Sequence, residues 1–161
     1  MSDAELAQLA ATLGARLRAD GLSLVTAESC TGGWIAKCVT DIAGSSGWLD
    51  RGFVTYSNAA KQDLLGVDAA TLAGHGAVSE PVVRQMAAGA LAQSAAQVAI
   101  SVSGVAGPGG GTAEKPVGMV CFGFAVPGGI STETRHFVGD RDAVRRQAVA
   151  HALSRVVALL D

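Results

Sequence analysis

A serine stands where a predicted strand gives way to a predicted helix. Ser29 follows the apolar run Leu22–Ala27, precedes residues with helical spacing, and is trailed by Gly32 and Gly33. At the carboxyl ends of parallel strands, helix N-termini point free N–H groups at anions, and ligands gather there. The Ser29 hydroxyl could attack a carbonyl carbon while backbone N–H groups of the turn hold the oxyanion that forms. Serine is also a favoured helix N-cap, and the spacing alone leaves both interpretations open.

A serine hydroxyl is a weak nucleophile until a base removes its proton. The three histidines stand in no recognisable catalytic setting and are interpreted as structural or solvent-facing residues: His75, His136 and His151. Lys61 remains, near the start of a short predicted helix that follows Tyr56. Burial and the positive end of a helix both disfavour a charged amine, so Lys61 could act as the base. Its alternative interpretation is a solvated surface charge.

Two further residues compete with Ser29 for the role of nucleophile. Ser57 lies four residues before Lys61, a spacing that places both side chains on one helix face. The Cys30 thiol lies at a helix N-terminus, which can make a thiol more acidic, but no histidine partner can be assigned to it. Cys30 and Cys38 lack a second pair of metal ligands, so no metal ion is predicted. Cys121 completes an odd number of cysteines without C-x-x-C spacing, which indicates reduced thiols.

A glycine-rich segment and an arginine cluster could bind an anion. Residues 104–116 are too long and too rich in glycine for an ordinary connection. Lys115 is followed by Pro116, which does not fit a P-loop, yet consecutive glycines can form a nest of N–H groups for a phosphate or carboxylate. The alternative is a flexible hairpin. Three arginines lie in the first turns of the last predicted helix, where positive charge is unfavourable because of the helix dipole: Arg141, Arg145 and Arg146. A bound anion would offset this unfavourable interaction. We select Arg145 for that contact, with solvated arginines as the alternative.

These candidates are positioned by alternating strands and helices. The predicted strands are Leu22–Ala27, Gly52–Ser57, Gln97–Ser103, Val117–Val126 and Ile130–Val138, the last two forming a hairpin. Helices are predicted from a capping box at Ser2 to Gly21, after Gly33, from the cap residue Asn58 to Gly66, after the cap residue Ser79 and from Asp140, with a loop and a helical turn at 68–76. This order predicts a three-layer α/β/α sandwich with a mixed, mostly parallel sheet of about five strands.

Composition limits the classes of protein that remain. The chain has 161 residues, 49% of them hydrophobic and 4% aromatic, and a formal net charge of -2. These values predict one α/β domain spanning 1–161, with a core of small aliphatic side chains and no nucleic-acid partner. The longest nearly apolar run, Val117 to Val126, is half the roughly twenty residues of a membrane-spanning helix, so no membrane partner is expected. The start of the chain lacks the features of a signal peptide, which predicts a cytoplasmic protein. The Ala-rich helix could provide a flat self-association face, and we expect a homodimer.

Three motifs in order resemble the CinA C-terminal family: Thr26-Ala27-Glu28-Ser29-Cys30-Thr31-Gly32-Gly33, Thr55-Tyr56-Ser57-Asn58-Ala59-Ala60-Lys61, and the segment from Gly107 to Gly118. The likeness runs from about Leu24 to the last helix. The family includes stand-alone nicotinamide mononucleotide amidohydrolases. The resemblance implies hydrolysis of the nicotinamide amide of this small-molecule nucleotide to nicotinate mononucleotide and ammonia, in pyridine nucleotide salvage and without a cofactor.

The same resemblance assigns roles to individual residues. Ser29 would be the nucleophile, Lys61 the base and then the acid for ammonia, and Tyr56 a hydrogen-bonding assistant. The implied substrate-binding residues are Cys30, Thr31, Gly32, Gly104, Ala106, Gly109 and Thr112, with Arg145 near the phosphate. The competing interpretation is a non-catalytic nucleotide-binding or regulatory module in which Ser29 is only a helix cap. A penicillin-recognising type of serine hydrolase fits less well, because neither Ser29 nor Ser57 has a lysine three residues later.

Overall fold

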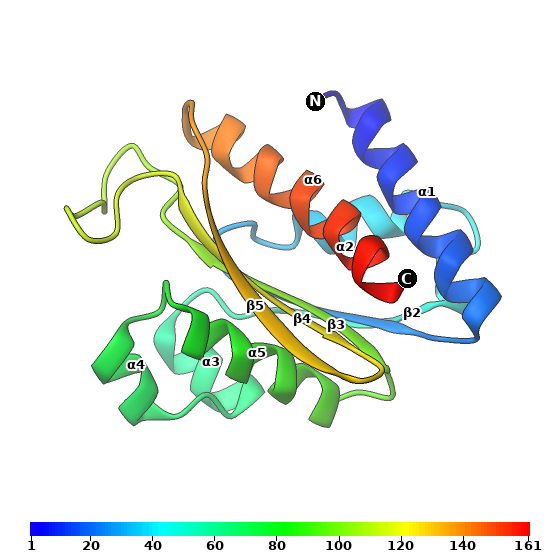
Figure 1. Ribbon diagram of the computed structural model, residues 1–161, viewed down its shortest axis with the longest axis horizontal. Coiled ribbons are helices and arrows are strands. Elements are labelled where there is room, and N and C mark those ends of the chain that lie inside the picture. The colour runs from blue at the N-terminus through cyan, green and yellow to red at the C-terminus, as the bar shows by residue number, and fades with distance from the viewer.

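A five-stranded sheet lies between two layers of helices (Figure 1). The computed structural model describes residues 1–161. The strands are β1 (Leu24–Glu28), β2 (Leu49–Val54), β3 (Val98–Gly104), β4 (Met119–Val126) and β5 (Gly129–His136), in the spatial order β2-β1-β3-β4-β5. Strands β2, β1 and β3 are parallel, and β4 and β5 add antiparallel pairs. The predicted mixed sheet and three-layer architecture are confirmed.

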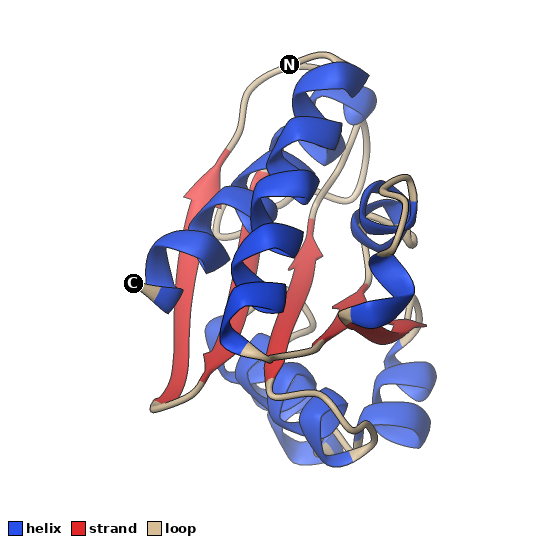
Figure 2. Cartoon of the chain, turned by 90° about the vertical axis from the view of Figure 1, so that its right-hand side faces the viewer, coloured by secondary structure: helices blue, strands red, loops and turns tan.

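The helices divide between the two faces of the sheet. Helices α1 (Asp3–Asp20), α2 (Trp34–Thr40) and α6 (Arg141–Leu160) cover one face, and α3 (Asn58–Leu65), α4 (Ala69–His75) and α5 (Glu80–Ala92) cover the other (Figures 1 and 2). A single 3₁₀ turn, Ser45–Gly47, precedes β2. Each face buries its own cluster of apolar side chains, and β1 is buried along its whole length. No helix is both long enough and apolar enough to span a membrane.

Most predicted helix boundaries are confirmed by their caps. Ser2 forms the capping box with Glu5, Gly21 ends α1 in the left-handed conformation, and Ser79 and Asp140 cap α5 and α6. Two boundaries differ from the prediction. The side chain of Ser57, not Asn58, caps α3, because the chain leaves the sheet after Val54 to begin that helix. The segment 68–76, expected to be a loop with one turn, forms the short helix α4.

The register of the parallel strands places three hydroxyl residues side by side. Glu28 at the end of β1 lies opposite Val54 of β2 and Val102 of β3. The pairing continues one residue further, since Thr55 N donates to Glu28 O at 2.9 Å and Ser29 N donates to Val102 O at 3.0 Å. Ser29 is therefore flanked by the residues that follow these partners, Thr55 and Ser103. All three lie at the carboxyl edge of the sheet, where the predicted site was expected.

Helix α5 approaches α3 closely at one glycine, which leads to a stability prediction. A Cβ atom on Gly89 would lie 1.8 Å from the Leu65 carbonyl oxygen of α3. Alanine normally exceeds glycine in helix propensity by about 1 kcal/mol, but overpacking costs about 1–3 kcal/mol. We expect Gly89→Ala to lower the free energy of unfolding by about 2 kcal/mol. In the control Gly74→Ala of α4, the added methyl meets no atom within 4 Å. Urea denaturation measures both, and equal midpoints would contradict the prediction.

Candidate active site

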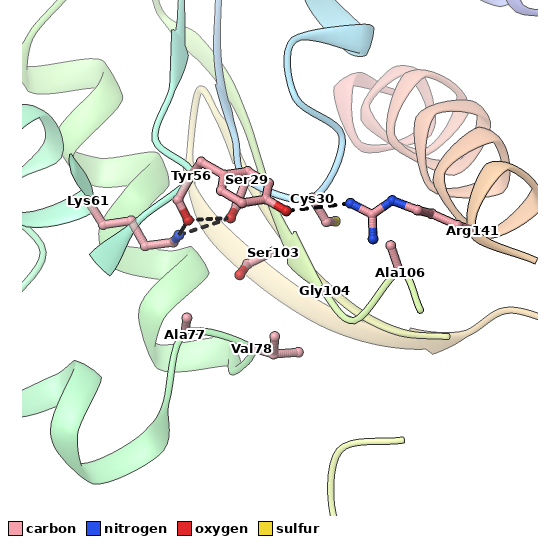
Figure 3. A pocket seen from close by; sticks show the side chains of 10 residues that line it. All are labelled: Ser29, Cys30, Tyr56, Lys61, Ala77, Val78, Ser103, Gly104, Ala106 and Arg141. Atoms are coloured by element: carbon pink, nitrogen blue, oxygen red, sulfur yellow. Dashed lines mark hydrogen bonds between the residues drawn. The ribbon is translucent and has the colours of Figure 1, made fainter. Parts of the chain in front are cut away.

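The amine of Lys61 lies beside the hydroxyl of Ser29, although 32 residues separate them in the chain. The Lys61 Nζ to Ser29 Oγ distance is 2.9 Å (Figure 3). The Lys61 side chain is only 1% exposed, and Ser29 is 8% exposed. Strand β1 delivers Ser29 from one side, and the first turns of α3 deliver Lys61 from the other. The predicted pairing of these two residues is present in the structure.

The surroundings of Lys61 favour its neutral form. Burial lowers the pKa of the Lys61 amine, and no carboxylate opposes this effect. The amine donates hydrogen bonds to two backbone carbonyls, Thr55 O at 2.9 Å and Tyr56 O at 3.1 Å. A neutral amine has two hydrogens and one lone pair. In the structure the amine also donates to Ser29 Oγ at 2.9 Å, and the Ser29 hydroxyl lies 3.4 Å from Tyr56 O. In the neutral form, with both hydrogens on the carbonyls, the lone pair would face the Ser29 hydroxyl, which suits the removal of its proton.

The turn after Ser29 leaves two backbone donors unused. Gly32 N donates to Ser29 O at 3.0 Å, so its hydrogen is consumed within the turn. The N–H groups of Cys30 and Thr31 make no hydrogen bond in the structure. They follow Ser29 directly, where an oxyanion formed by attack of its hydroxyl on a bound carbonyl would need donors. Of the three turn residues predicted to contact substrate, Cys30 and Thr31 have free N–H groups, and Gly32 does not.

A buried carboxylate holds this turn in place. Glu28 is fully buried, and its carboxylate accepts hydrogen bonds from Thr31 Oγ1 at 2.6 Å, Ile35 N at 2.8 Å and Ala36 N at 3.1 Å. It thus caps the N-terminus of α2. Burial is the largest influence on the Glu28 carboxyl and raises its pKa, while the three donors oppose that change. We did not expect this role from the sequence, although an acidic residue between a buried strand and a helix start is a usable signal.

One cavity of about 210 Å³ opens over the Ser29 and Lys61 pair. Its lining combines polar groups with a small apolar wall (Figure 3): Ser29, Cys30, Tyr56, Lys61, Ala77, Val78, Ser103, Gly104, Ala106 and Arg141. Six of the residues selected from the sequence for catalysis or substrate binding therefore meet in one place, whereas Thr31 and Gly32 do not line the cavity. Ser103, Arg141 and the apolar pair Ala77 and Val78 were not selected. Volume and lining suit a small planar group with polar substituents.

Comparisons with known proteins decide the family. The family model described as the CinA C-terminal domain matches residues 6–160. The chain belongs to the CinA C-terminal domain family. It is 60% identical over 154 residues to the nicotinamide-nucleotide amidohydrolase PncC of Escherichia coli strain K12, which covers 95% of this chain and 93% of that protein.

Two other relatives show the extent of the likeness. A CinA-like protein of Anaeromyxobacter dehalogenans strain 2CP-C is 52% identical over 140 residues, and these span 87% of this chain but 34% of that longer protein. The crystal structure of the competence/damage inducible protein CihA from Agrobacterium tumefaciens matches with a TM-score of 0.93 at 46% identity, covering 98% of this chain and 96% of that one. The similarity of this chain to its relatives, in sequence and in fold, therefore extends over nearly its whole length.

Two arginines of α6, Arg141 and Arg145, have positions that differ from the prediction. Arg145, selected as the phosphate contact, donates to Cys30 O at 2.9 Å and Thr31 O at 3.3 Å, and its guanidinium lies 5.3 Å from the centre of the Trp34 ring. In this CinA domain Arg145 supports the turn after Ser29 and does not line the cavity. Arg141 is the arginine in the cavity. It donates to Gly107 O at 2.8 Å, and one of its nitrogens lies 3.5 Å from the Tyr56 hydroxyl.

The glycine-rich segment contributes to the cavity only at its start. Gly104 and Ala106 line the cavity, whereas Gly109 and Thr112 are exposed in the part of the loop that projects from the body of the CinA domain (Figure 1). Thr112 is bonded to Lys115 within the loop, through N to O at 2.9 Å and through its hydroxyl oxygen, which accepts from Lys115 N at 3.0 Å. Thr112 therefore bonds within the loop and not at the cavity in this structure.

The rival nucleophiles and bases of the CinA domain have other surroundings. Burial raises the pKa of the Cys30 thiol to about 12, so it stays protonated and weakly nucleophilic. Ser57 accepts a hydrogen bond from Ala60 N at 3.0 Å as the cap of α3. His151 pairs with Glu133 and packs on Phe122, and no histidine lines the cavity. No group of three or more His, Cys, Asp or Glu side chains is arranged to hold a metal ion.

Proposed function

We propose that this CinA domain is an amidohydrolase that converts nicotinamide mononucleotide and water to nicotinate mononucleotide and ammonia. The observation that carries the proposal is the 2.9 Å contact between the Ser29 hydroxyl and the buried Lys61 amine in the cavity. The PncC relatives, which are named nicotinamide-nucleotide amidohydrolases, support the substrate class. The proposal extends to a place in pyridine nucleotide salvage and to the cytoplasm.

In the first half of the proposed mechanism, Lys61 accepts the Ser29 proton as Ser29 Oγ bonds to the carboxamide carbon. The carbonyl oxygen becomes an oxyanion, which the free N–H groups of Cys30 and Thr31 stabilise. Oxyanion donors of this kind contribute about 3–4 kcal/mol each to the transition state in well-studied cases. Glu28 and Arg145 act indirectly, by fixing the turn that presents these donors.

In the second half, the ammonium of Lys61 gives its proton to the amide nitrogen. The C–N bond breaks, ammonia leaves, and the nicotinoyl group remains bound to Ser29 as an ester. A water molecule then attacks the ester carbon and gives a proton to the neutral Lys61 amine, which returns that proton to Ser29 Oγ as the acid is released. One amine thus serves as base and then acid in each half of the reaction, and the two carbonyls that bind it hold it in place throughout.

The cavity is small compared with typical ligand pockets of about 300–1,000 Å³. We therefore assign it to the nicotinamide ring, which would lie against Ala77 and Val78, while the ribose phosphate extends through the open mouth. Arg141 supplies a cation at that mouth, and Tyr56, whose side chain is largely exposed, lies beside it. Arg141 is accordingly our proposed phosphate contact, with the backbone of Gly104 and Ala106 alongside.

Ammonia release on mixing the protein with nicotinamide mononucleotide tests the proposed function. Formation of ammonia and nicotinate mononucleotide in equal amounts is the expected result, and a chelator should not affect the rate. Binding of the nucleotide by calorimetry without release of ammonia would contradict the proposal and favour the regulatory module. Light scattering after size-exclusion chromatography tests the homodimer, which also remains a proposal.

The pH dependence of the reaction provides a separate prediction. Only the neutral Lys61 amine has the lone pair that removes the Ser29 proton, and burial lowers the pKa of that amine. We expect kcat/KM to rise with pH and to level off above a pKa that lies below that of an ordinary lysine. Initial rates over a pH series measure this. A profile that falls as pH rises through that range would contradict a neutral lysine base.

A further inference from the structure

Ser103 is a buried hydroxyl that the proposed mechanism does not use. It lies at the carboxyl end of β3, beside Ser29, and is only 2% exposed. It lines the cavity, and its side chain makes no hydrogen bond within the protein. Ser101, two residues earlier on the same strand face, does have a partner, since it donates to Val83 O at 2.6 Å. Hydroxyl groups in largely buried positions are normally hydrogen-bonded, and the Ser103 hydroxyl, which faces the cavity, is free to bond to a ligand there.

The other hydrogen-bonding side chains of the cavity already have roles. Ser29 and Lys61 are bonded to one another, and Tyr56 and Arg141 lie together at the mouth. Figure 3 shows the Ser103 hydroxyl turned into the same space as the Ser29 oxygen and the Lys61 amine. A primary carboxamide that reacts at Ser29 brings two N–H donors into this space, and they need acceptors. Among the side chains of the cavity, Ser103 is the acceptor without another partner.

We propose that Ser103 Oγ accepts a hydrogen bond from the carboxamide nitrogen of the substrate and so holds the leaving group. This inference rests on the proposed amidase function and makes Ser103 its leaving-group contact. The carbonyl oxygen would lie toward the N–H groups of Cys30 and Thr31. The nitrogen would lie toward Ser103, within reach of the Lys61 proton that it must receive. Ser103 would thus favour an amide over an ester of the same nucleotide.

The experiment compares two substrates that share every group except the leaving group. Nicotinamide mononucleotide carries the amide, and the methyl ester of nicotinate mononucleotide has no N–H donor at that position. We expect Ser103→Ala to lower kcat/KM for the amide about tenfold and to change that for the ester less than about twofold, as loss of one hydrogen bond predicts. Ser103→Thr keeps the hydroxyl and should restore the wild-type ratio of the two rates.

The control is Ser101→Ala, which removes a buried hydroxyl from the same strand face outside the cavity. It should leave the amide-to-ester ratio unchanged, whatever it does to stability. An equal loss on both substrates in Ser103→Ala would overturn the proposal, since it would show that Ser103 only supports the site. No loss on either substrate would also overturn it. The wild-type rate on the amide tests the proposed function separately. If the wild type does not hydrolyse the amide, the proposed function fails. If it does, the change of the amide-to-ester ratio in Ser103→Ala tests the role of Ser103 alone.

Discussion

Ser29→Ala is expected to reduce ammonia release from nicotinamide mononucleotide by about four orders of magnitude or more, the largest effect of any single substitution here. The variant lacks the only oxygen positioned to form the acyl-enzyme. The cavity, the free N–H groups of the turn and Arg141 are unchanged, so the variant should still bind the nucleotide. A coupled ammonia assay measures turnover, and calorimetry measures binding. An unchanged rate would falsify the assignment of Ser29 as nucleophile.

The matched control for this prediction is Ser57→Ala, because Ser57 was the rival nucleophile on sequence grounds. Its hydroxyl caps α3 through Ala60 N and does not line the cavity. Loss of an N-cap costs about 1 kcal/mol of stability, so the variant should melt at a lower temperature. Its activity at a temperature where it is fully folded should remain close to that of the wild type. Loss of activity in Ser57→Ala together with activity in Ser29→Ala would exchange the two roles.

Local sequence signals sufficed for the residues that begin and end elements. Ser29 was predicted from a strand followed by a turn, and Lys61 from its place after the next strand, since parallel strands end at one edge of the sheet. Their direct contact also needs burial of a lysine, which is uncommon and which the sequence could only suggest. The caps at Ser2, Ser79 and Asp140 were predicted because capping depends on neighbours in the chain.

Contacts between distant elements were harder to predict. Arg141 and Arg145 are four residues apart, so they share a face of α6 and lie about 6 Å from one another along its axis. Which of them reaches the cavity depends on where α6 lies along the sheet, and this is set by packing against α1 and α2. The helix position brings Arg145 to the carbonyls of Cys30 and Thr31 and leaves Arg141 at the cavity.

The roles of Glu28 and Ser103 were also hard to predict, because they depend on which groups surround these side chains in the folded protein. Glu28 ends an apolar strand, where a buried carboxylate is unfavourable without hydrogen-bond donors. The backbone N–H groups at the N-terminus of α2 supply these donors. Ser103 becomes notable only when the structure shows which neighbouring hydroxyl has a partner and which does not. Neither property follows from residue type or spacing along the chain.

Lys61→Met is expected to lower kcat about a thousandfold while leaving nucleotide binding largely intact. Methionine fills much of the space of the lysine stem but has no lone pair that can accept the Ser29 proton and no proton for ammonia. The pH dependence attributed to the Lys61 amine should disappear from the remaining activity. The control is Lys37→Met, which removes an exposed lysine paired with Asp41 on α2 and should retain full activity.

A second variant separates the charge of Lys61 from its basicity. Lys61→Arg keeps a cation near Thr55 O and Tyr56 O, but a guanidinium stays protonated at every pH that the protein tolerates. If the amine acts as a base, this variant should be as inactive as Lys61→Met. If the residue serves only to supply positive charge for the oxyanion, Lys61→Arg should recover much of the rate. Recovery would move the base role to another group, whereas equal loss in both variants supports proton transfer through Lys61.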